Sequence, residues 1–234
     1  MRTIGIIGGV GPSASAQFYL ALQKQRSKLG HRPHILLDSI PVPYSLEEEA
    51  LTQGADLMPY KSLLIKSAKK LERGGADFIT LPCNTLSCFI KDIKAHVQIP
   101  VLNTVNLTVK ALAHKKVESA GLFATSHTIE QGLYDKAMHS YDINLIIPTP
   151  NEQKKIDHYI MSQVRRAEAL QPKCPSARLN DIAQRLLARG ASQLILGCTD
   201  LPRLANIPLI DPITELTTQS LQMLREPQQV YLNS

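Results

Sequence analysis

Two segments of this sequence resemble each other at a spacing of 115 residues, and this repeat constrains the fold more than any other feature. Gly75–Thr85 reads GADFITLPCNT and Gly190–Asp200 reads GASQLILGCTD, with Gly-Ala, a Leu and a Cys in register. A unit repeated at this spacing predicts two similar halves, roughly residues 1–115 and 116–227. Chance similarity is the alternative, because strand–turn–helix units resemble one another in sequence.

The two halves match elsewhere in the same order. The further pairs are Ile4–Gly8 with Ala120–Ala124, Tyr19 with Tyr134, and Ile99–Asn103 with Ile207–Asp211. Apolar runs alternate with helical patterns of about 12 to 18 residues, which is typical of βα units in a parallel sheet. Strands are expected near 3–8, 34–40, 77–82, 100–103, 118–124, 143–147, 193–197 and 208–210. Helices are expected near 13–28, 56–73, 86–95, 104–113, 127–139, 151–168, 176–189 and 214–224.

We therefore predict the α/β class, with two pseudo-symmetric lobes, each a parallel-sheet βα sandwich, and the active site in the cleft between them. Residues 1–102 with 209–234 are expected to form the first lobe, which carries Cys83. Residues 103–208 are expected to form the second lobe, which carries Cys198. Side-chain helix caps are expected at Ser13 and at Thr125 or Ser126.

Composition and charge favour a soluble cytoplasmic protein that binds neither membranes nor nucleic acids. The chain is 44% hydrophobic, has no apolar stretch long enough to span a membrane, and begins without a signal peptide's apolar core. Its net charge of +6 fits an anionic ligand, but Lys and Arg are scattered, without the basic stripe of a nucleic-acid surface. The turn Gly8–Gly11 has neither phosphate-loop nor dinucleotide-loop spacing. The four cysteines form no C-x-x-C pair, so no zinc site is expected.

Cys83 and Cys198 each stand one residue after a strand that ends in Leu-Pro or Leu-Gly, and directly before small polar residues that can open a helix. The carboxyl end of a parallel strand is where ligands of open α/β sheets bind. A helix N-terminus there predicts a lowered thiol pKa and amide donors for a carboxylate. Single buried cysteines are usually apolar packing residues, but two at equivalent strand ends indicate reactive thiols.

If the two lobes face each other, these thiols reach one ligand from opposite sides. Inverting a stereocentre beside a carboxylate needs a base on one face and an acid on the other. One thiolate and one thiol can exchange these roles, which predicts a reversible racemase or epimerase. Cys88 and Cys174 lack this context and are expected to be structural or incidental. All four cysteines are expected to be free thiols in a reducing compartment; a disulfide between the reactive pair is the alternative.

Three segments carry a resemblance to a known family: GGVGP at Gly8–Pro12, PCNT at Pro82–Thr85, and GCTD at Gly197–Asp200. Over nearly its whole length the chain resembles the aspartate/glutamate racemase family, and within it the aspartate racemase branch. The resemblance implies a two-lobed α/β fold, a two-base mechanism without pyridoxal phosphate or another cofactor, an amino-acid substrate, and a homodimer.

The resemblance also implies a set of substrate-binding residues. They are Gly9, Ser45, Asn84, Thr85, Thr125, Arg165 and Thr199. Those next to the cysteines are expected to hold the α-carboxylate and amino group, and Arg165, with Arg166 beside it, best matches a substrate-binding lysine. Ser45 stands where aspartate racemases tend to carry an arginine, and a hydroxyl cannot replace a bidentate clamp on a side-chain carboxylate. Aspartate, glutamate and other polar amino acids therefore stay open as substrates.

Other activities of the same fold stay open too: a hydantoin racemase, a maleate isomerase or a malonate-type decarboxylase. Decarboxylases of this group need only one of the two cysteines, so the presence of both favours proton transfer on two faces. The sequence does not separate covalent from acid/base use of the thiols. An alternative of another class is a non-catalytic amino-acid-binding sensor, which would need neither an acid nor a base.

Overall fold

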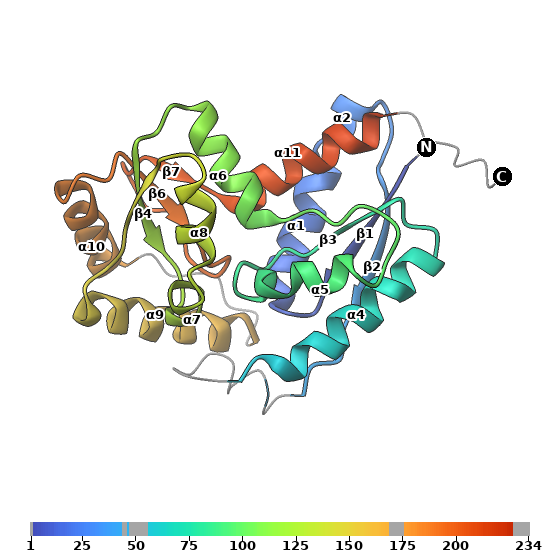
Figure 1. Ribbon diagram of the computed structural model, residues 1–234, viewed down its shortest axis with the longest axis horizontal. Coiled ribbons are helices and arrows are strands. Elements are labelled where there is room, and N and C mark those ends of the chain that lie inside the picture. The colour runs from blue at the N-terminus through green and yellow to red at the C-terminus, as the bar shows by residue number, and fades with distance from the viewer. Residues whose placement is uncertain (1, 44–45, 47–55, 169–175, 227–234) are drawn as a thin grey trace.

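A computed structural model of the chain describes residues 2–43, 46, 56–168 and 176–226. Two parallel sheets lie in the two halves of the molecule (Figure 1). The first half of the chain forms β1 (Thr3–Gly8), α1 (Pro12–Lys24), α2 (Arg26–Leu29), β2 (His34–Ser39), α4 (Met58–Arg73), β3 (Phe78–Thr80), the 3₁₀ helix η1 (Thr85–Phe89), α5 (Ile90–Lys94) and α6 (Thr104–His114). The second half forms β4 (Ser119–Phe123), α7 (Ser126–Glu130), α8 (Leu133–His139), β5 (Asn144–Ile146), α9 (Pro150–Glu168), α10 (Ala177–Ala188), β6 (Gln193–Leu196), β7 (Leu209–Ile210) and α11 (Pro212–Arg225).

The two sheets repeat one topology, and the predicted α/β class is confirmed. The first sheet has the order β2-β1-β3 and the second β5-β4-β6-β7, with every pair parallel. The strand expected at 100–103 is only a single bridge, from Val101 to Ile79, at the place where β7 pairs with β6. Both edges use the same hydrogen bond: the amide of Ile79 donates to the Pro100 carbonyl, and that of Leu194 to the Pro208 carbonyl, each at 2.8 Å.

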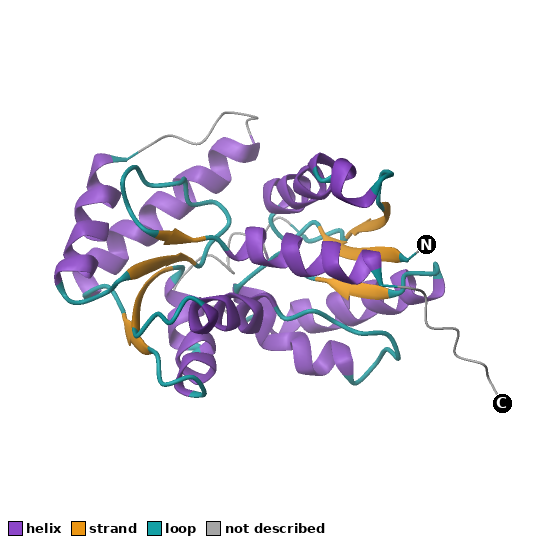
Figure 2. Cartoon of the chain, turned by 90° about the horizontal axis from the view of Figure 1, so that it is seen from above, coloured by secondary structure: helices purple, strands orange, loops and turns teal. Residues whose placement is uncertain are grey.

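Each sheet is buried between two layers of helices, as the view from above shows (Figure 2). On the first sheet, α1 and α11 form a core with one face, and α4 and α5 form a core with the other. On the second sheet, α6 and α8 cover one face, and α9 and α10 cover the other. Strands buried on both faces are continuous apolar runs in the sequence, which is why the strand positions could be read from it.

The two halves exchange their last helices. Helix α6 follows the first sheet in the chain, but its Val109 and Leu112 pack in the core of the second sheet. Helix α11 follows the second sheet, but its Leu216 packs with the first sheet and α1. The predicted lobe boundaries stay a prediction; β7, which that division places in the first lobe, pairs with β6 of the second sheet.

Some predicted helices differ at their ends. Ser13 does not cap α1: the cap position is Gly11, with φ 77°, and Pro12 begins the helix, where its fixed φ is favourable and its missing N–H costs nothing. Thr125 does cap α7, because its side chain accepts from the amide of Thr128. The helix expected at 127–139 is interrupted by Gly132, with φ 60°, and becomes α7 and α8.

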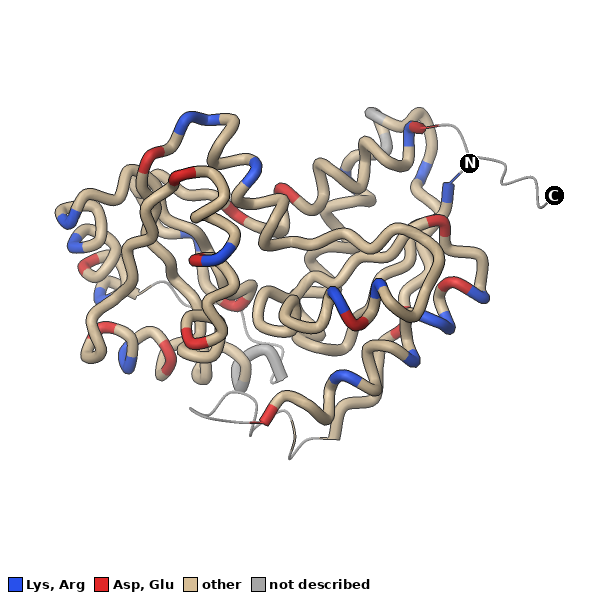
Figure 3. Tube along the Cα trace, viewed as in Figure 1, with Lys and Arg blue, Asp and Glu red and all other residues tan. Residues whose placement is uncertain are grey.

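Charged residues are spread over both halves. Figure 3 shows Lys and Arg interspersed with Asp and Glu along the trace, in keeping with the scattered positive charge of the sequence. Within the described ranges, no helix has the length and apolar character that crossing a membrane requires. The cytoplasmic location stays a prediction.

Candidate active site

Cys83 stands beyond the carboxyl end of β3, between that strand and η1. Burial raises the pKa of its thiol from the ordinary 9.0 to about 11. The amides of Leu86 and Thr85 favour the thiolate but do not outweigh burial, and the negative charges of Cys88 and Asp200 raise the pKa further. The predicted lowering is therefore wrong for Cys83, because burial of the thiol outweighs the amides that favour the thiolate.

Cys198 occupies the matching position after β6. The prediction that Thr199 and Asp200 open a helix is wrong, because a turn follows, closed by the amide of Leu201 donating to the Cys198 carbonyl at 3.2 Å. Pro202 comes next and has no N–H with which to extend this turn. The two halves therefore place a cysteine at the same strand end but continue differently after it.

The cysteines that the structure describes are free thiols: Cys83, Cys88 and Cys198. Cys83 packs against the core of the first sheet and Cys198 against that of the second. Cys88 also packs against the first core, in keeping with a structural role, which stays a prediction. Cys174 lies outside the described residues.

The residue before Cys198 has no room for a side chain. A Cβ on Gly197 would lie 2.8 Å from Leu122 Cδ1, 2.9 Å from Ala124 Cβ and 3.0 Å from the Phe123 carbonyl oxygen. This glycine lets the end of β6 approach β4 closely, and its amide donates to the same Phe123 carbonyl at 2.6 Å. The close approach fixes the backbone from which Cys198 projects.

Asn84, next to Cys83, is held from the other half of the chain. The hydroxyl of Tyr134 on α8 donates to Asn84 Oδ1 at 2.8 Å, and both side chains are buried. In this arrangement the Oδ1 end of the amide faces Tyr134. The Nδ2 group of Asn84 is then buried without a hydrogen-bond partner among the described residues. An unpaired buried donor is costly, so it indicates a place where a ligand's acceptor binds.

Three threonine hydroxyls form a cluster where the two halves of the chain meet, and one of them belongs to Thr85, the residue after Asn84. Thr85 Oγ1 is 3.0 Å from Thr128 Oγ1 and 3.3 Å from Thr125 Oγ1, and the last two are 3.0 Å apart. Thr85 belongs to the first half, whereas Thr125 and Thr128 stand at the start of α7 in the second. These hydroxyls and the Asn84 amide give the Cys83 side of the interface a set of donors suited to a carboxylate.

The sequence profile described as Asp/Glu/hydantoin racemase matches residues 7–219 of this chain. The protein belongs to this racemase family. The broad-specificity amino-acid racemase RacX of Bacillus subtilis is 27% identical over 224 residues, which cover 89% of this chain and 92% of RacX.

Solved structures agree with the racemase fold. An aspartate racemase homologue from Pyrococcus horikoshii has a TM-score of 0.75 at 22% identity and covers 97% of this chain and 100% of its own. The aspartate racemase of Picrophilus torridus also has a TM-score of 0.75 at 22% identity, with 96% of this chain and 94% of its own covered.

The glycine-rich turn of this racemase-family chain is closed by its own hydrogen bonds, and the predicted substrate contact of Gly9 stays a prediction. The amide of Gly9 donates to Ser15 Oγ at 3.3 Å, and Ser15 Oγ donates to the Gly11 carbonyl at 3.2 Å. The amide of Gly9 is therefore engaged within the turn. Gly9 has φ 83°, and a Cβ there would lie 2.6 Å from the Ile40 carbonyl oxygen, so the position requires glycine.

The other predicted substrate contacts of this racemase-family protein stay predictions. Thr199 is half-buried directly after Cys198. Ser45 lies outside the described residues. Arg165 is in α9, but its side chain is outside the described part of the structure.

The sequence predicted no role in the site for four residues that bear on it: Thr128, Tyr134, Asp157 and Asp200. The spacing of Thr125 and Thr128 was an available signal, because a cap and the residue three positions later face each other. Asp200 could have been noticed as a charge two residues from a candidate catalytic thiol. Tyr134 and Asp157 contact residues far away in the sequence, so no local sequence pattern predicts these contacts.

Proposed function

We propose that this protein is a cofactor-independent amino-acid racemase that interconverts L and D enantiomers by proton transfer between Cys83 and Cys198. The observation that carries the proposal is the buried donor set beside Cys83: the unpartnered Nδ2 of Asn84 and the hydroxyl of Thr85, which contacts threonines of the other half. A carboxylate accepts several such hydrogen bonds at once. The substrate is therefore an amino acid held by its α-carboxylate, with its α-carbon close to Cys83.

The state of Cys83 supports an assignment of roles. Its pKa of about 11 keeps it as a thiol at neutral pH, so it enters the reaction as the acid. Cys198, as a thiolate, removes the α-proton and forms its own S–H bond, while the electron pair passes from the α-carbon into the carboxylate. Cys83 then delivers its proton to the opposite face and becomes the thiolate. The reverse reaction starts from that state, so each cysteine is a base in one direction and an acid in the other.

The donors next to Cys83 are suited to the transition state. When the α-proton leaves, negative charge grows on the carboxylate oxygens, and fixed donors in a site of low dielectric stabilise that charge. The buried Asn84 amide is hydrogen-bonded to Tyr134, which limits its reorganisation during the reaction. The two thiols and the donors together require no electron sink from a cofactor.

The substrates we propose are polar amino acids: aspartate, glutamate or another of this class. Ser45 replaces the arginine expected for a side-chain carboxylate, so a range wider than aspartate fits this chain. RacX, at 27% identity, is named for broad specificity. Arg165 is the residue proposed to reach the substrate's side chain. We also propose a homodimer, which sedimentation velocity will test.

The experiment is α-hydrogen exchange. Purified protein, treated with hydroxylamine and a chelator to remove pyridoxal phosphate and metals, is incubated in deuterium oxide with single L-amino acids and followed by proton NMR. The α-signal of at least one polar amino acid is expected to disappear, and the variant with both Cys83→Ala and Cys198→Ala is expected to leave it intact. No exchange with any amino acid would contradict the proposal.

A further inference from the structure

The turn between β4 and α7, residues 124–126, is held by two side chains of α9. Asp157 accepts from the Ser126 amide through Oδ1 at 2.9 Å and from the Ser126 hydroxyl through Oδ2 at 2.5 Å. Gln153, one helical turn before Asp157, donates from Nε2 to the Ala124 carbonyl at 2.9 Å and to Asp157 Oδ1 at 3.0 Å. The residues on both sides of Thr125 are therefore tied to the same helix.

These hydrogen bonds admit one arrangement of the side chains. The Ala124 carbonyl and the Asp157 carboxylate can only accept, so Gln153 must turn its NH₂ group toward both. Bonds to a carboxylate are stronger than bonds between neutral groups. The Ser126 amide is also one of the first amides of α7, which have no partner inside the helix. Asp157 thus accepts the hydrogen bond of an amide that would otherwise bind water.

The turn held in this way carries the hydroxyls that meet the first half of the chain. Thr125 lies between Ala124 and Ser126, and Thr128 follows in the first turn of α7. Their Oγ1 atoms are 3.3 and 3.0 Å from Thr85 Oγ1, close to the limit at which a hydroxyl hydrogen bond forms. A small displacement of the turn would lengthen these contacts beyond hydrogen-bonding distance.

We propose that Asp157 is a positioning residue of the reaction, which acts through Ser126 to hold Thr125 where it and Thr85 receive the substrate's carboxylate, with the buried Thr128 hydroxyl supporting both. The proposal rests on the proposed function and adds to α9 a role at the α-carboxylate end of the substrate. Arg165 lies on the same helix but is proposed to contact the other end of the substrate, its side chain.

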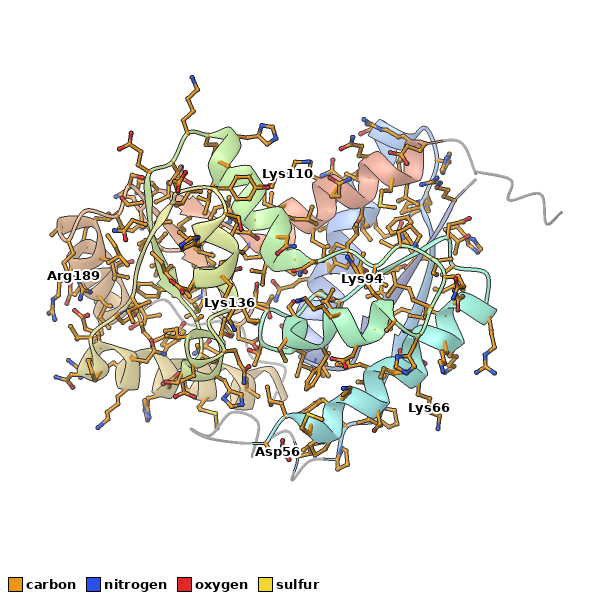
Figure 4. All side chains as sticks on the ribbon, viewed as in Figure 1. Asp56, Lys66, Lys94, Lys110, Lys136 and Arg189 are labelled. Carbon is orange, nitrogen blue, oxygen red and sulfur yellow. The ribbon has the colours of Figure 1, made fainter. Side chains whose placement is uncertain are left out.

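Glu152 on the same helix provides a matched control. It is also a buried carboxylate, and it accepts from the Thr149 amide and from Arg189 Nη2, at 2.9 and 2.8 Å. Figure 4 shows Arg189 at the outer edge of the second half, away from the first half of the chain. Glu152→Ala therefore removes hydrogen bonds of the same kind from α9 without touching the turn at Thr125.

The test compares kcat and KM of racemisation for Asp157→Ala, Asp157→Asn and Glu152→Ala, each with its urea unfolding midpoint. Asp157→Ala is expected to lower kcat/KM about tenfold, mainly through KM, because misplaced binding groups weaken substrate positioning. Asp157→Asn is expected to stay within about threefold of wild type, since its Oδ1 still accepts from the Ser126 amide. Glu152→Ala is expected to lower the unfolding midpoint and leave kcat/KM unchanged.

An unchanged kcat/KM in Asp157→Ala, or an equal loss in Glu152→Ala, would overturn the proposal. If Asp157→Ala does not fold, Ser126→Ala replaces it, with an expected rise in KM of about threefold; an unchanged KM would count against the proposal in the same way. Hydrogen–deuterium exchange of the amides at 126–128 gives a readout that needs no activity. Asp157→Ala is expected to speed this exchange about tenfold and Glu152→Ala to leave it unchanged, whereas an inactive wild type with the expected exchange would contradict only the proposed function.

Discussion

The two strand ends that carry Cys83 and Cys198 have the same backbone position and different surroundings. Cys83 follows Leu-Pro and precedes a 3₁₀ helix, whereas Cys198 follows Leu-Gly and precedes a turn. In the first half, burial and the charge of Asp200 keep the thiol protonated. The repeated sheet topology thus accounts for where the two thiols stand, and the residues that differ between the halves account for their different surroundings.

The tyrosines at matching positions of the repeat make the same point. Tyr134 is 0% exposed and reaches across to Asn84, whereas Tyr19 is 38% exposed on α1. This contact between the halves is therefore made by the tyrosine of the second half, and it lies beside the donor set on the Cys83 side. A repeated scaffold with an asymmetric site can bind one end of the substrate on one side of the interface.

The largest effect is expected from the cysteines themselves. Cys83→Ala and Cys198→Ala should each lower racemisation by about 10³-fold or more, because each removes the acid or base for one face. Either variant can still exchange the α-hydrogen of one enantiomer with solvent. Cys88→Ala is the control and should stay within twofold of wild type. Full activity in either of the first two variants would rule out the two-thiol mechanism.

Gly197→Ala tests whether the glycine before Cys198, where the first half has Pro82 before Cys83, is needed to position the thiol. The added Cβ meets Leu122, Ala124 and the Phe123 carbonyl, so β6 must move and carry Cys198 with it. We expect a loss of about 1 to 3 kcal/mol in the free energy of unfolding and about a tenfold loss in kcat. Pro82→Ala, at the matching position of the first half, adds no atom and should affect kcat less. The comparison fails if urea unfolding and kcat respond equally to both substitutions.

Tyr134→Phe against Tyr19→Phe tests the asymmetry of the interface. Loss of the Tyr134 hydroxyl leaves the Asn84 amide free to turn and its oxygen without that donor, at a cost of about 1 to 2 kcal/mol in unfolding free energy. KM should rise about fivefold with a smaller change in kcat. Tyr19→Phe should match wild type in both assays. Equal kinetics for the two variants would mean that Tyr134 does not prepare the site.

Burial is the largest cause of the raised pKa at Cys83, and Asp200→Asn tests a lesser one, so it should have the smallest effect. Removing a negative charge near the thiol lowers its pKa from about 11, so more thiolate is present at any pH below that value. The rate of Cys83 alkylation by iodoacetamide at pH 8, measured by mass spectrometry of the Cys83 peptide, should rise severalfold. In the wild type the same rate should keep rising with pH up to about 11. A slower or unchanged rate in Asp200→Asn would contradict the assigned cause.

Much of the scaffold could be predicted from the sequence because its causes are local. Buried parallel strands are apolar runs, and the repeat of the Gly-Ala…Cys segment placed both thiols at strand ends. The Thr125 cap depends only on its own helix. Features that need the whole fold were not predicted: the hydrogen bond from Tyr134 to Asn84 and the hydrogen bonds from Ser126 to Asp157.

The pKa of Cys83 shows why local reasoning was insufficient at the site itself. The sequence correctly placed polar residues and a helical turn after the thiol, and those favour the thiolate through the amides of Leu86 and Thr85. Burial acts in the opposite direction and is larger. Its size depends on how densely both halves surround the sulfur, which no window of sequence contains.

The most direct test of the central claim, that two thiols act on opposite faces of the substrate, follows deuterium during the first turnovers. Racemisation of a protiated L-amino acid in deuterium oxide is stopped at low conversion, and the two enantiomers are separated and examined by mass spectrometry. Two-thiol catalysis predicts deuterium at the α-carbon of the D product and none in the remaining L substrate, because each face exchanges protons with its own cysteine. Deuterium in both pools from the start would contradict the account, because it would indicate a single group serving both faces.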